Sequence, residues 1–375
     1  MNTTTKVIVW VVVIILVIWG ISSMSKNGST SSESIKIGFV GPLSGELANM
    51  GENARAAVMI AVEEINAAGG VLGKKIEVVY EDDLCTGATG ANAMSKLVNT
   101  DKVVAVLGSL CSGATLGEAP IAEAAKVVQL SYCSTSPLIT AAGDYIFRDV
   151  PSDLFQADYA AKYLMQNGKT KVALLAVKND WGEGLRKAFN SAFVKAGGTI
   201  VSDDSFNPDA KDLKTQLTTI KAKNPDAVYF AGYTDASIAG LKQASDLNLK
   251  TLFFGADAWD DTKIWSELGK LGDGAMFTVV GTNSSDEFKA KMKIKLGKED
   301  LVYCSNYAYD GVKIIAEAIK KAGKADGTSI KNALYKIKYT GGISSKEHMF
   351  DANGDPVSAA YIIKVAKNGK AEEMK

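Results

Sequence analysis

The stretch VVAVLGSLCSGATLGEAPIAEAAK, residues 103–126, decides the fold. It starts with VVAVLG, a short run that is apolar on both faces of an extended chain, and passes through a glycine turn into a helical segment over 115–126. A strand that is buried on both faces and followed by a helix is typical of a parallel sheet covered by helices. The same succession recurs along the chain, so the sequence predicts an α/β fold.

Strands and helices alternate in two sets of similar size. In the first set, strands are predicted at 35–41, 76–82, 103–109, 127–131 and 145–150, with helices at 52–67, 91–99 and 115–126. In the second set, strands are predicted at 171–177, 199–206, 227–233, 251–256 and 274–280, with helices at 183–195, 213–223 and 237–247. Three helices at 286–296, 307–322 and 330–337 and a last strand at 359–367 follow. Two such sets predict two doubly wound domains that bind a small molecule beyond the carboxyl ends of their strands.

The composition excludes several classes of function. The chain has 375 residues with 42 basic and 42 acidic side chains, and it has no basic stripe, so nucleic-acid binding is not expected. His348 is the only histidine, which excludes mechanisms and zinc sites that need two or three imidazoles. The four cysteines lie far apart without a C-x-x-C pair. We therefore expect neither a metal nor a cofactor.

The first 34 residues differ from the rest of the chain. An uncharged apolar run over 7–21 has tryptophans near both ends, and a Ser-rich linker follows it. No A-x-A-like cleavage site and no cysteine for lipid attachment comes next. We favour an uncleaved membrane anchor, with a cleaved signal peptide and a buried core helix as alternatives. Either of the first two would place the remaining residues outside the membrane, where disulfides persist.

The turn GSLCSGAT, 108–115, could hold an anion or a nucleophile. Ser112 is predicted to be the N-cap of the helix, with free N–H groups behind it at 113–115, and such a terminus favours a carboxylate or phosphate. Alternatively, Ser112 only caps its own helix. A catalytic Ser or Cys would need a base within reach, but His348 lies far along the chain and no G-x-S-x-G motif is present. Catalysis at this turn is therefore not expected.

Two cysteines follow predicted strands that could be neighbours in one sheet. These are Cys85 in EDDLCTGATG and Cys111 in GSLCSGAT. Outside the cell a disulfide is the simplest interpretation, and two buried thiols are the alternative.

Other polar and aromatic side chains also follow predicted strands. Ser134 and Thr135 in SYCSTSP offer hydroxyls, or they form an ordinary turn. Asp257 alone would be a solvated or capping carboxylate, and Tyr233 and Trp181 could simply pack against a wall. Taken together, hydroxyls and helix N-termini suit a carboxylate, an acid suits an amine, and aromatics suit a side chain. The combination indicates a zwitterionic ligand.

Six segments, taken in order, resemble the extracellular solute-binding proteins of branched-chain amino-acid ABC transporters: GFVGPLSGELANMG, INAAGGVLGKKIEVVYEDDLC, GSLCSGAT, STSP, DWGEGL and YAYDG. The resemblance covers nearly all of residues 35–370. It implies two Rossmann-like doubly wound lobes, joined by three hinge crossovers, that close on a ligand. Residues 35–149 and 281–343 would form lobe 1, and residues 150–280 and 344–375 would form lobe 2. Residues 1–34 would precede them as a hydrophobic helix and linker.

The resemblance also implies roles for individual residues. Ser112 would hold the ligand α-carboxylate, while the stretch at 131–135 would supply a backbone carbonyl at Cys133 and hydroxyls at Ser134 and Thr135. Asp257 stands where an acidic residue, usually Glu, binds the α-ammonium. Since Asp is shorter by about one methylene, the amine would sit nearer or bind through a water.

Further positions resemble the walls of the family's binding site. Tyr233 matches a tyrosine of the second lobe, Trp181 replaces a tyrosine that covers the site, and Met50 stands where an aromatic is frequent. Cys85 and Cys111 match a disulfide seen in the family. For the two remaining cysteines, 133 and 304, we favour two buried thiols over a second disulfide.

The sequence therefore predicts an extracytoplasmic, non-enzymatic solute receptor. It would bind a small neutral amino acid, with Leu, Ile or Val as first choice, and deliver it to the membrane permease of an ABC importer. We expect a monomer tethered to the membrane by its N-terminal segment. The alternatives are a ligand-sensing ectodomain for another amino acid or amide, and a hydrolase that uses Ser112 or Cys111.

Overall fold

The computed structural model describes residues 34–298 and 301–374. The predicted N-terminal hydrophobic helix lies outside the described residues. Within them, no helix combines the length and the apolar character that crossing a membrane requires.

The first sheet has five parallel strands, ordered β2-β1-β3-β4-β5. Its strands are β1 (Ile35–Gly41), β2 (Ile76–Asp82), β3 (Ala105–Leu107), β4 (Val128–Ser131) and β5 (Ile146–Arg148). The three strands from β3 to β5 are buried along their whole length, as their apolar runs predict. Because β1 lies between β2 and β3, the strand order reverses at the β1–β3 pair.

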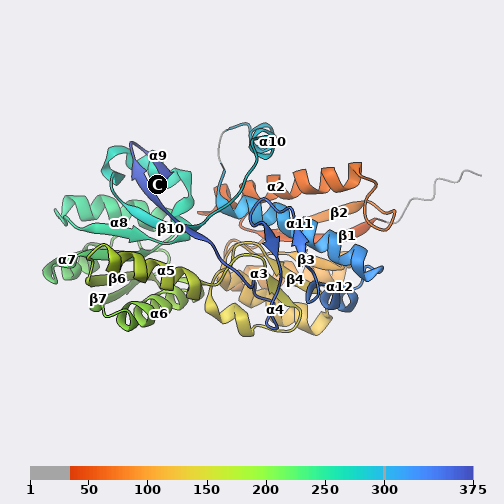
Figure 1. Cartoon of the computed structure of the whole chain (residues 1–375), viewed down its shortest axis with the longest axis horizontal. Coiled ribbons are helices and arrows are strands. Elements are labelled where there is room, and N and C mark those ends of the chain that lie inside the picture. Colours follow the sequence, from red (N-terminus) through yellow and green to blue (C-terminus); the bar gives the residue numbers. More distant parts are fainter. Residues whose placement is uncertain (1–33, 299–300, 375) are drawn as a thin grey trace, which may run out of the picture. The chain divides into compact units, whose positions relative to one another are not determined.

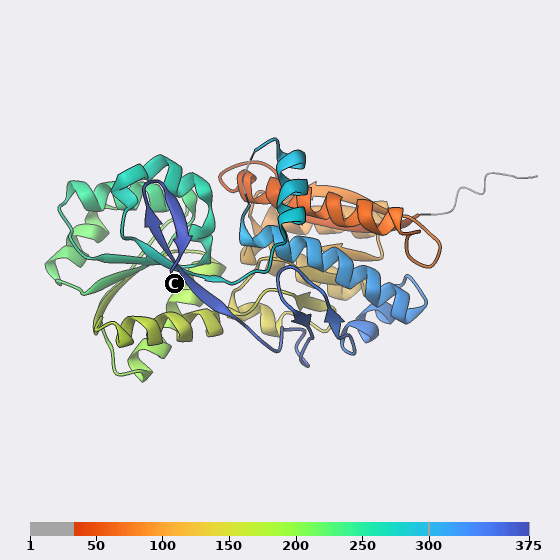
Figure 2. The same ribbon diagram turned by 45° about the horizontal axis from the view of Figure 1, so that its top comes forward.

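Helices cover both faces of this sheet (Figures 1 and 2). On one face lie α2 (Ala48–Ala67) and α11 (Tyr303–Ala322), together with α10 (Asp286–Leu296) and α12 (Gly327–Leu334). On the other lie α3 (Gly87–Lys96), which runs on into a π-helical turn (Leu97–Asp101), and α4 (Ser112–Ala125). Helices α3 and α4 approach closely because Gly117 has no side chain: a Cβ there would lie 2.3 Å from the Gly87 carbonyl oxygen.

The second sheet is mixed and has seven strands, ordered β14-β13-β10-β9-β8-β6-β7. The parallel part consists of β6 (Lys171–Val177), β7 (Thr199–Phe206), β8 (Ala227–Ala231), β9 (Leu252–Gly255) and β10 (Met276–Val280). The sequence predicted parallel strands. The structure adds two antiparallel pairings, because β13 (Tyr361–Lys367) pairs antiparallel with β10 and β14 (Lys370–Glu373) pairs antiparallel with β13. Between β10 and β13 the chain forms α10, α11 and α12 on the first sheet. It then returns to the second sheet, where β13 runs opposite to β10.

Helices also lie on both faces of the second sheet (Figure 2). They are α5 (Asp153–Gln166) and α6 (Asp180–Lys195) on one face, with α7 (Lys214–Ala222), α8 (Thr234–Asp246) and α9 (Thr262–Leu268) completing the cover. The core between strand and helix is aromatic: the rings of Phe189 and Tyr229 stack with centroids 3.9 Å apart. The sequence analysis missed α5, α9 and β14.

The chain passes between the two sheets three times. The passages lie between β5 and α5, between β10 and α10, and between α12 and β13. The third passage contains a small antiparallel hairpin of β11 (Tyr339–Thr340) and β12 (Glu347–His348). Arg148 at the end of β5 ties the first passage to the third, because its guanidinium makes two hydrogen bonds with the Asp355 carboxylate.

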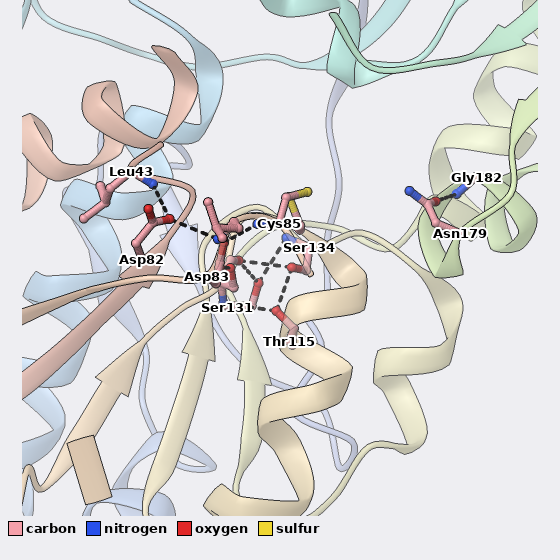
Figure 3. The surroundings of a disulfide bond; sticks show 12 residues. Leu43, Asp82, Asp83, Cys85, Thr115, Ser131, Ser134, Asn179 and Gly182 are labelled. Atoms are coloured by element: carbon pink, nitrogen blue, oxygen red, sulfur yellow. Dashed lines mark hydrogen bonds between the residues drawn. A yellow bond between two sulfur atoms is a disulfide. The ribbon is translucent and has the colours of Figure 1, made fainter. Parts of the chain in front are cut away.

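A disulfide joins Cys85 and Cys111, with their Cα atoms 5.3 Å apart. This confirms the predicted pairing of the two cysteines. The strands that precede them, β2 and β3, were expected to be neighbours in the sheet, and they are not. Since β1 lies between β2 and β3, the two loops meet across the carboxyl end of β1. Beside the disulfide, Ser131, Ser134 and Thr115 are linked by hydrogen bonds (Figure 3).

Removing this disulfide should destabilise the protein. The double substitution Cys85→Ala/Cys111→Ala opens a loop of 26 residues, and we expect the free energy of unfolding to fall by about 3–4 kcal/mol. Denaturant unfolding under non-reducing conditions measures the change. An unchanged midpoint would show that the cross-link does not restrict the unfolded chain.

Candidate functional site

A buried cavity lies where the carboxyl ends of the two sheets meet. Its lining comprises Leu47, Met50, Leu110, Ser112, Cys133, Trp181, Tyr233, Asp257, Ala258 and Tyr303. Its volume is about 20 Å³, which is room for roughly one water molecule. Six of the eight predicted ligand-binding residues line this cavity.

Topology explains why these residues meet. In the first sheet, the segments after β1, β3 and β4 supply Met50 in α2, Ser112 in α4 and Cys133 in a turn. In the second sheet, β6 lies between β7 and β8, so the strand order reverses there as well. The segments after β6, β8 and β9 supply Trp181, Tyr233 and Asp257. In each sheet, the cavity therefore lies beyond the carboxyl ends of the strands at which the strand order reverses, which is where crevices form in doubly wound folds.

Ser112 is the first residue of α4 and not its N-cap, which corrects the prediction. The cap is Cys111, whose backbone is extended (φ −92°, ψ 130°) and whose side chain makes no capping hydrogen bond. The Ser112 hydroxyl instead accepts a hydrogen bond from the Ser136 N–H at 3.2 Å. The N–H of Thr115 is not free, because it donates to the Cys111 carbonyl at 3.0 Å. The earlier N–H groups of the first turn have no partner within the helix.

Two predicted residues do not line the cavity. The Ser134 hydroxyl lies 2.8 Å from that of Thr115 and donates to the Ser109 carbonyl at 3.0 Å, so it joins α4 to the turn after β3 (Figure 3). The carbonyl of Thr135 accepts from Arg148 at 3.0 Å and from the Asp153 N–H at 2.8 Å. Both residues are buried in the supporting structure behind Cys133.

Asp257 is the acid of the cavity. It begins a single 3₁₀ turn (Asp257–Asp260) directly after β9 and is only 4% exposed. One carboxylate oxygen accepts from the Ala258 N–H at 3.1 Å and the other from the Tyr303 hydroxyl at 2.5 Å. Burial raises the pKa of Asp257 to about 6, although hydrogen bonds from Tyr303 and Gln156 favour the charged form. The group is therefore an ionisable carboxyl held in a dry environment.

A second acid, Asp153, lies behind the first. It is the first residue of α5, it is fully buried, and neither carboxylate oxygen makes a well-formed hydrogen bond within residues 34–298 and 301–374. Burial and the negative charge of Asp257 raise the pKa of Asp153 well above its ordinary value. The sequence analysis missed this residue. The capping serine before it, Ser152, was the available signal, since its side chain accepts from the Leu154 N–H.

Two stacked aromatic rings form one wall of the cavity. Trp181 in the first turn of α6 and Tyr233 at the N-cap of α8 have ring centroids 4.8 Å apart and planes 12° apart. Across from them, the first sheet contributes Leu47, Met50 and Leu110. The space between a helix N-terminus and a carboxylate is thus lined by apolar and aromatic groups, which suits a small zwitterion with an uncharged side chain.

A second disulfide joins Cys133 and Cys304, with Cα atoms 5.4 Å apart. Two free thiols were favoured from the sequence, and that expectation is wrong. The prediction failed because α11 was expected to begin at residue 307, whereas it begins at Tyr303 and carries Cys304 to the turn after β4. The same shift brings Tyr303 into the cavity, which the sequence analysis did not anticipate.

Among the described residues, neither a cluster of metal ligands nor the histidine lines this cavity. Across residues 34–298 and 301–374, no cluster of three or more His, Cys, Asp or Glu side chains could hold a metal ion. Nε2 of His348 lies 3.1 Å from the Ser344 hydroxyl and 3.2 Å from the Asp310 carboxylate, and none of these three residues lines the cavity. Ser112 therefore has no imidazole base.

Known proteins share this architecture. The family description "Periplasmic binding protein" matches residues 34–370. A leucine-, isoleucine-, valine-, threonine- and alanine-binding protein of Pseudomonas aeruginosa is 31% identical over 340 residues, which cover 87% of this chain and 88% of that protein. The crystal structure of a leucine-binding protein from Thermotoga maritima superposes with a TM-score of 0.85 at 28% identity, covering 91% of this chain and 98% of that one.

A branched-chain amino acid transporter substrate-binding protein of Streptococcus pneumoniae, solved in complex with isoleucine, has a TM-score of 0.82 at 30% identity. The match covers 91% of this chain and 98% of that one. The two-lobe α/β architecture and the family match lead to one conclusion: this chain belongs to the periplasmic binding protein family.

Proposed function

We propose that this protein is the extracytoplasmic substrate-binding component of an ABC importer, and that it binds a small neutral amino acid and delivers it to a permease. One observation carries the proposal. The N-terminus of α4, which packs on the first sheet, and the buried carboxylate of Asp257, which follows a strand of the second sheet, both line the same apolar cavity. The names of the relatives, which bind leucine, isoleucine and valine, support this ligand class.

The α-carboxylate of the ligand would bind at Ser112. The first turn of α4 offers N–H groups and the positive end of the helix dipole, both of which favour an anion. The Ser112 hydroxyl accepts from Ser136, which leaves its own proton available to donate. The backbone carbonyl of Cys133 and the hydroxyl of Thr135 remain proposed contacts at the adjoining turn.

The α-ammonium would bind at Asp257, with the carboxyl of Asp153 as a second acid behind it. Burial raises the pKa of both carboxyls, and the charge of Asp257 raises that of Asp153 further, so the site has an unmet preference for a cation. A ligand ammonium supplies that cation and favours the ionised form of Asp257. The protein groups that would surround it are otherwise apolar or neutral, so selectivity for an α-amino group would come from these two acids.

Binding would require the lobes to move apart and then close. A cavity of about 20 Å³ is far smaller than an amino acid. We propose residues 35–149 and 281–343 as lobe 1 and residues 150–280 and 344–375 as lobe 2, with the three passages as hinges. Closure would then bring Trp181 and Tyr233 of lobe 2 over a side chain that rests on Met50 of lobe 1.

No enzymatic role is proposed. No imidazole lines the cavity beside Ser112, and Cys111 is held in a disulfide. Two disulfides suit an extracytoplasmic location. Membrane tethering by residues 1–34 and a monomeric state complete the proposal.

A ligand screen tests the proposed function. Purified protein is heated with each of the common amino acids in turn, and titration calorimetry follows for those that raise the melting temperature. Leucine, isoleucine or valine should give the largest increases, because bound ligand stabilises the folded state by mass action. If no neutral amino acid raises the melting temperature, the ligand assignment is wrong.

Acid should weaken ligand binding. Asp257 must be ionised to hold an ammonium, and burial, opposed by Tyr303 and Gln156, places its pKa at about 6. As the pH falls below that value the carboxyl takes up a proton, so we expect the leucine affinity to fall about tenfold per pH unit. Calorimetric titrations between pH 8 and pH 4.5 measure the profile. A flat profile would mean that Asp257 does not bind the amino group.

A further inference from the structure

Tyr303 connects the two lobes at the ligand cavity. It begins α11, which packs on the first sheet, yet its hydroxyl donates to Asp257 at 2.5 Å and its backbone N–H donates to Asp260 at 3.0 Å. Both acids belong to the 3₁₀ turn after β9 of the second sheet. The two hydrogen bonds therefore reach from a helix of one sheet to a turn of the other.

The neighbouring disulfide fixes where this tyrosine lies. Cys304 follows Tyr303 directly and is bonded to Cys133, which lines the cavity. The Tyr303 hydroxyl is 3.1 Å from the Cys133 sulfur, and its ring packs edge-on against Tyr307 one turn further along α11. Tyr303 is only 5% exposed, so its ring has little freedom to leave this position.

The hydrogen bond from Tyr303 acts on the charged form of Asp257. A carboxylate accepts about four hydrogen bonds, and Ala258 and Tyr303 supply one to each oxygen. The remaining lone pairs can face a ligand ammonium. Because a donated hydrogen bond favours the ionised carboxyl, the phenol both orients Asp257 and offsets the cost of its burial. Gln156 also favours the charged form of Asp257, and burial together with the charge of Asp257 raises the pKa of its ionisable neighbours Asp153, Tyr229, Tyr233 and Tyr361.

We propose that Tyr303 is a positioning residue for amino-group recognition: its hydroxyl holds Asp257 in the orientation that meets the ligand ammonium, and the Cys133–Cys304 disulfide holds Tyr303. The inference rests on the proposed function. It adds Tyr303, which is not among the eight predicted ligand-binding residues, as a determinant of selectivity.

The test compares Tyr303→Phe with Tyr307→Phe in the full-length protein. Leucine and 4-methylpentanoate, which is leucine without its amino group, are the two probes in calorimetric titrations. Tyr303→Phe should weaken leucine binding by about 10- to 100-fold, as expected for losing a hydrogen bond to a charged group, and change 4-methylpentanoate binding less than twofold. Tyr307→Phe, which keeps the contacts of Asp257, should leave both affinities within twofold.

A second readout needs no ligand. Carbon-13 NMR of the side-chain carboxyls should show that Tyr303→Phe raises the titration midpoint of Asp257, whereas Tyr307→Phe does not. The double substitution Cys133→Ser/Cys304→Ser should shift the midpoint in the same direction as Tyr303→Phe, and removing the Cys85–Cys111 disulfide should not.

The outcomes separate the two proposals. Equal losses for leucine and 4-methylpentanoate, or an unchanged Asp257 midpoint in Tyr303→Phe, would overturn the role of Tyr303 while leaving the receptor function intact. If the wild-type protein binds no neutral amino acid, the proposed function fails and the role in amino-group recognition fails with it.

Discussion

Asp257→Asn should reduce leucine affinity by about 30- to 4,000-fold. Truncating one partner of a buried, hydrogen-bonded charge pair costs about 2–5 kcal/mol, and each 1.4 kcal/mol is a factor of ten. The amide keeps the size of the carboxyl but cannot neutralise an ammonium. Asp153, which stays buried beside it, cannot compensate, because its own pKa is already raised by burial. Titration calorimetry at pH 7.5 measures the loss.

Asp286→Asn is the matched control for this substitution. Asp286 lies at the start of α10, outside the cavity, and its side chain is fully exposed. Its removal should leave leucine affinity within twofold. Asp257→Glu keeps the charge and should retain part of the binding, since the longer side chain moves the carboxylate into the cavity. If Asp257→Asn binds leucine like the wild type, the amino group is bound elsewhere.

Arg148→Met should lower the free energy of unfolding by about 3–5 kcal/mol, the usual cost of breaking a buried ion pair by removing one partner. Arg148 is fully buried, and its guanidinium donates to both oxygens of Asp355 at 2.6 and 2.9 Å. It also donates to the carbonyls of Thr135 and Ser136. The substitution leaves Asp355 and these carbonyls without their donor.

Denaturant unfolding at pH 7.5 measures this effect, with Arg186→Met as the control. Arg186 forms two ion pairs, to Glu183 and to Asp203, but at the surface, where such pairs contribute about 0–1 kcal/mol. Both substitutions remove one positive charge, while Arg148 donates five hydrogen bonds and Arg186 donates two. Equal losses of stability would show that burial adds nothing to the Arg148 pair. Because Ser136 also donates to Ser112, a weaker ligand affinity should accompany the loss in Arg148→Met.

The strands were largely predictable because most of them are short apolar runs bounded by turn residues, and a strand is the usual structure of so short a run. Helix α5 was missed for a physical reason: its periodicity is inverted at the start. Leu154 and Phe155 are 56% and 47% exposed, whereas Asp153 and Gln156 are buried. The hydrophobic pattern therefore gave no signal for the start of a helix whose first turn buries polar side chains. Helix α9 has only seven residues, too few for its periodicity to stand out.

The site was predictable to the extent that strand ends define it. Residues that directly follow a strand, such as Ser112 and Asp257, lie in the cavity as expected. Ser134 fails because the direction of a side chain within a loop depends on its partners, here Thr115 and Ser109. Tyr303 and Asp153 were missed because only tertiary packing brings the starts of α11 and α5 to the carboxyl ends of strands from which they are distant in sequence.

The return of the chain to the second sheet has a consequence for folding. β10 pairs on one side with β9 and on the other with β13, and residues 281–360 lie between β10 and β13. Contacts between segments so distant in sequence form slowly, because a long loop must close first. Until residues 361–373 arrive, β10 is an open edge strand, and such edges are templates for pairing with other chains. We therefore expect the C-terminal hairpin to protect the protein from aggregation as well as completing the sheet.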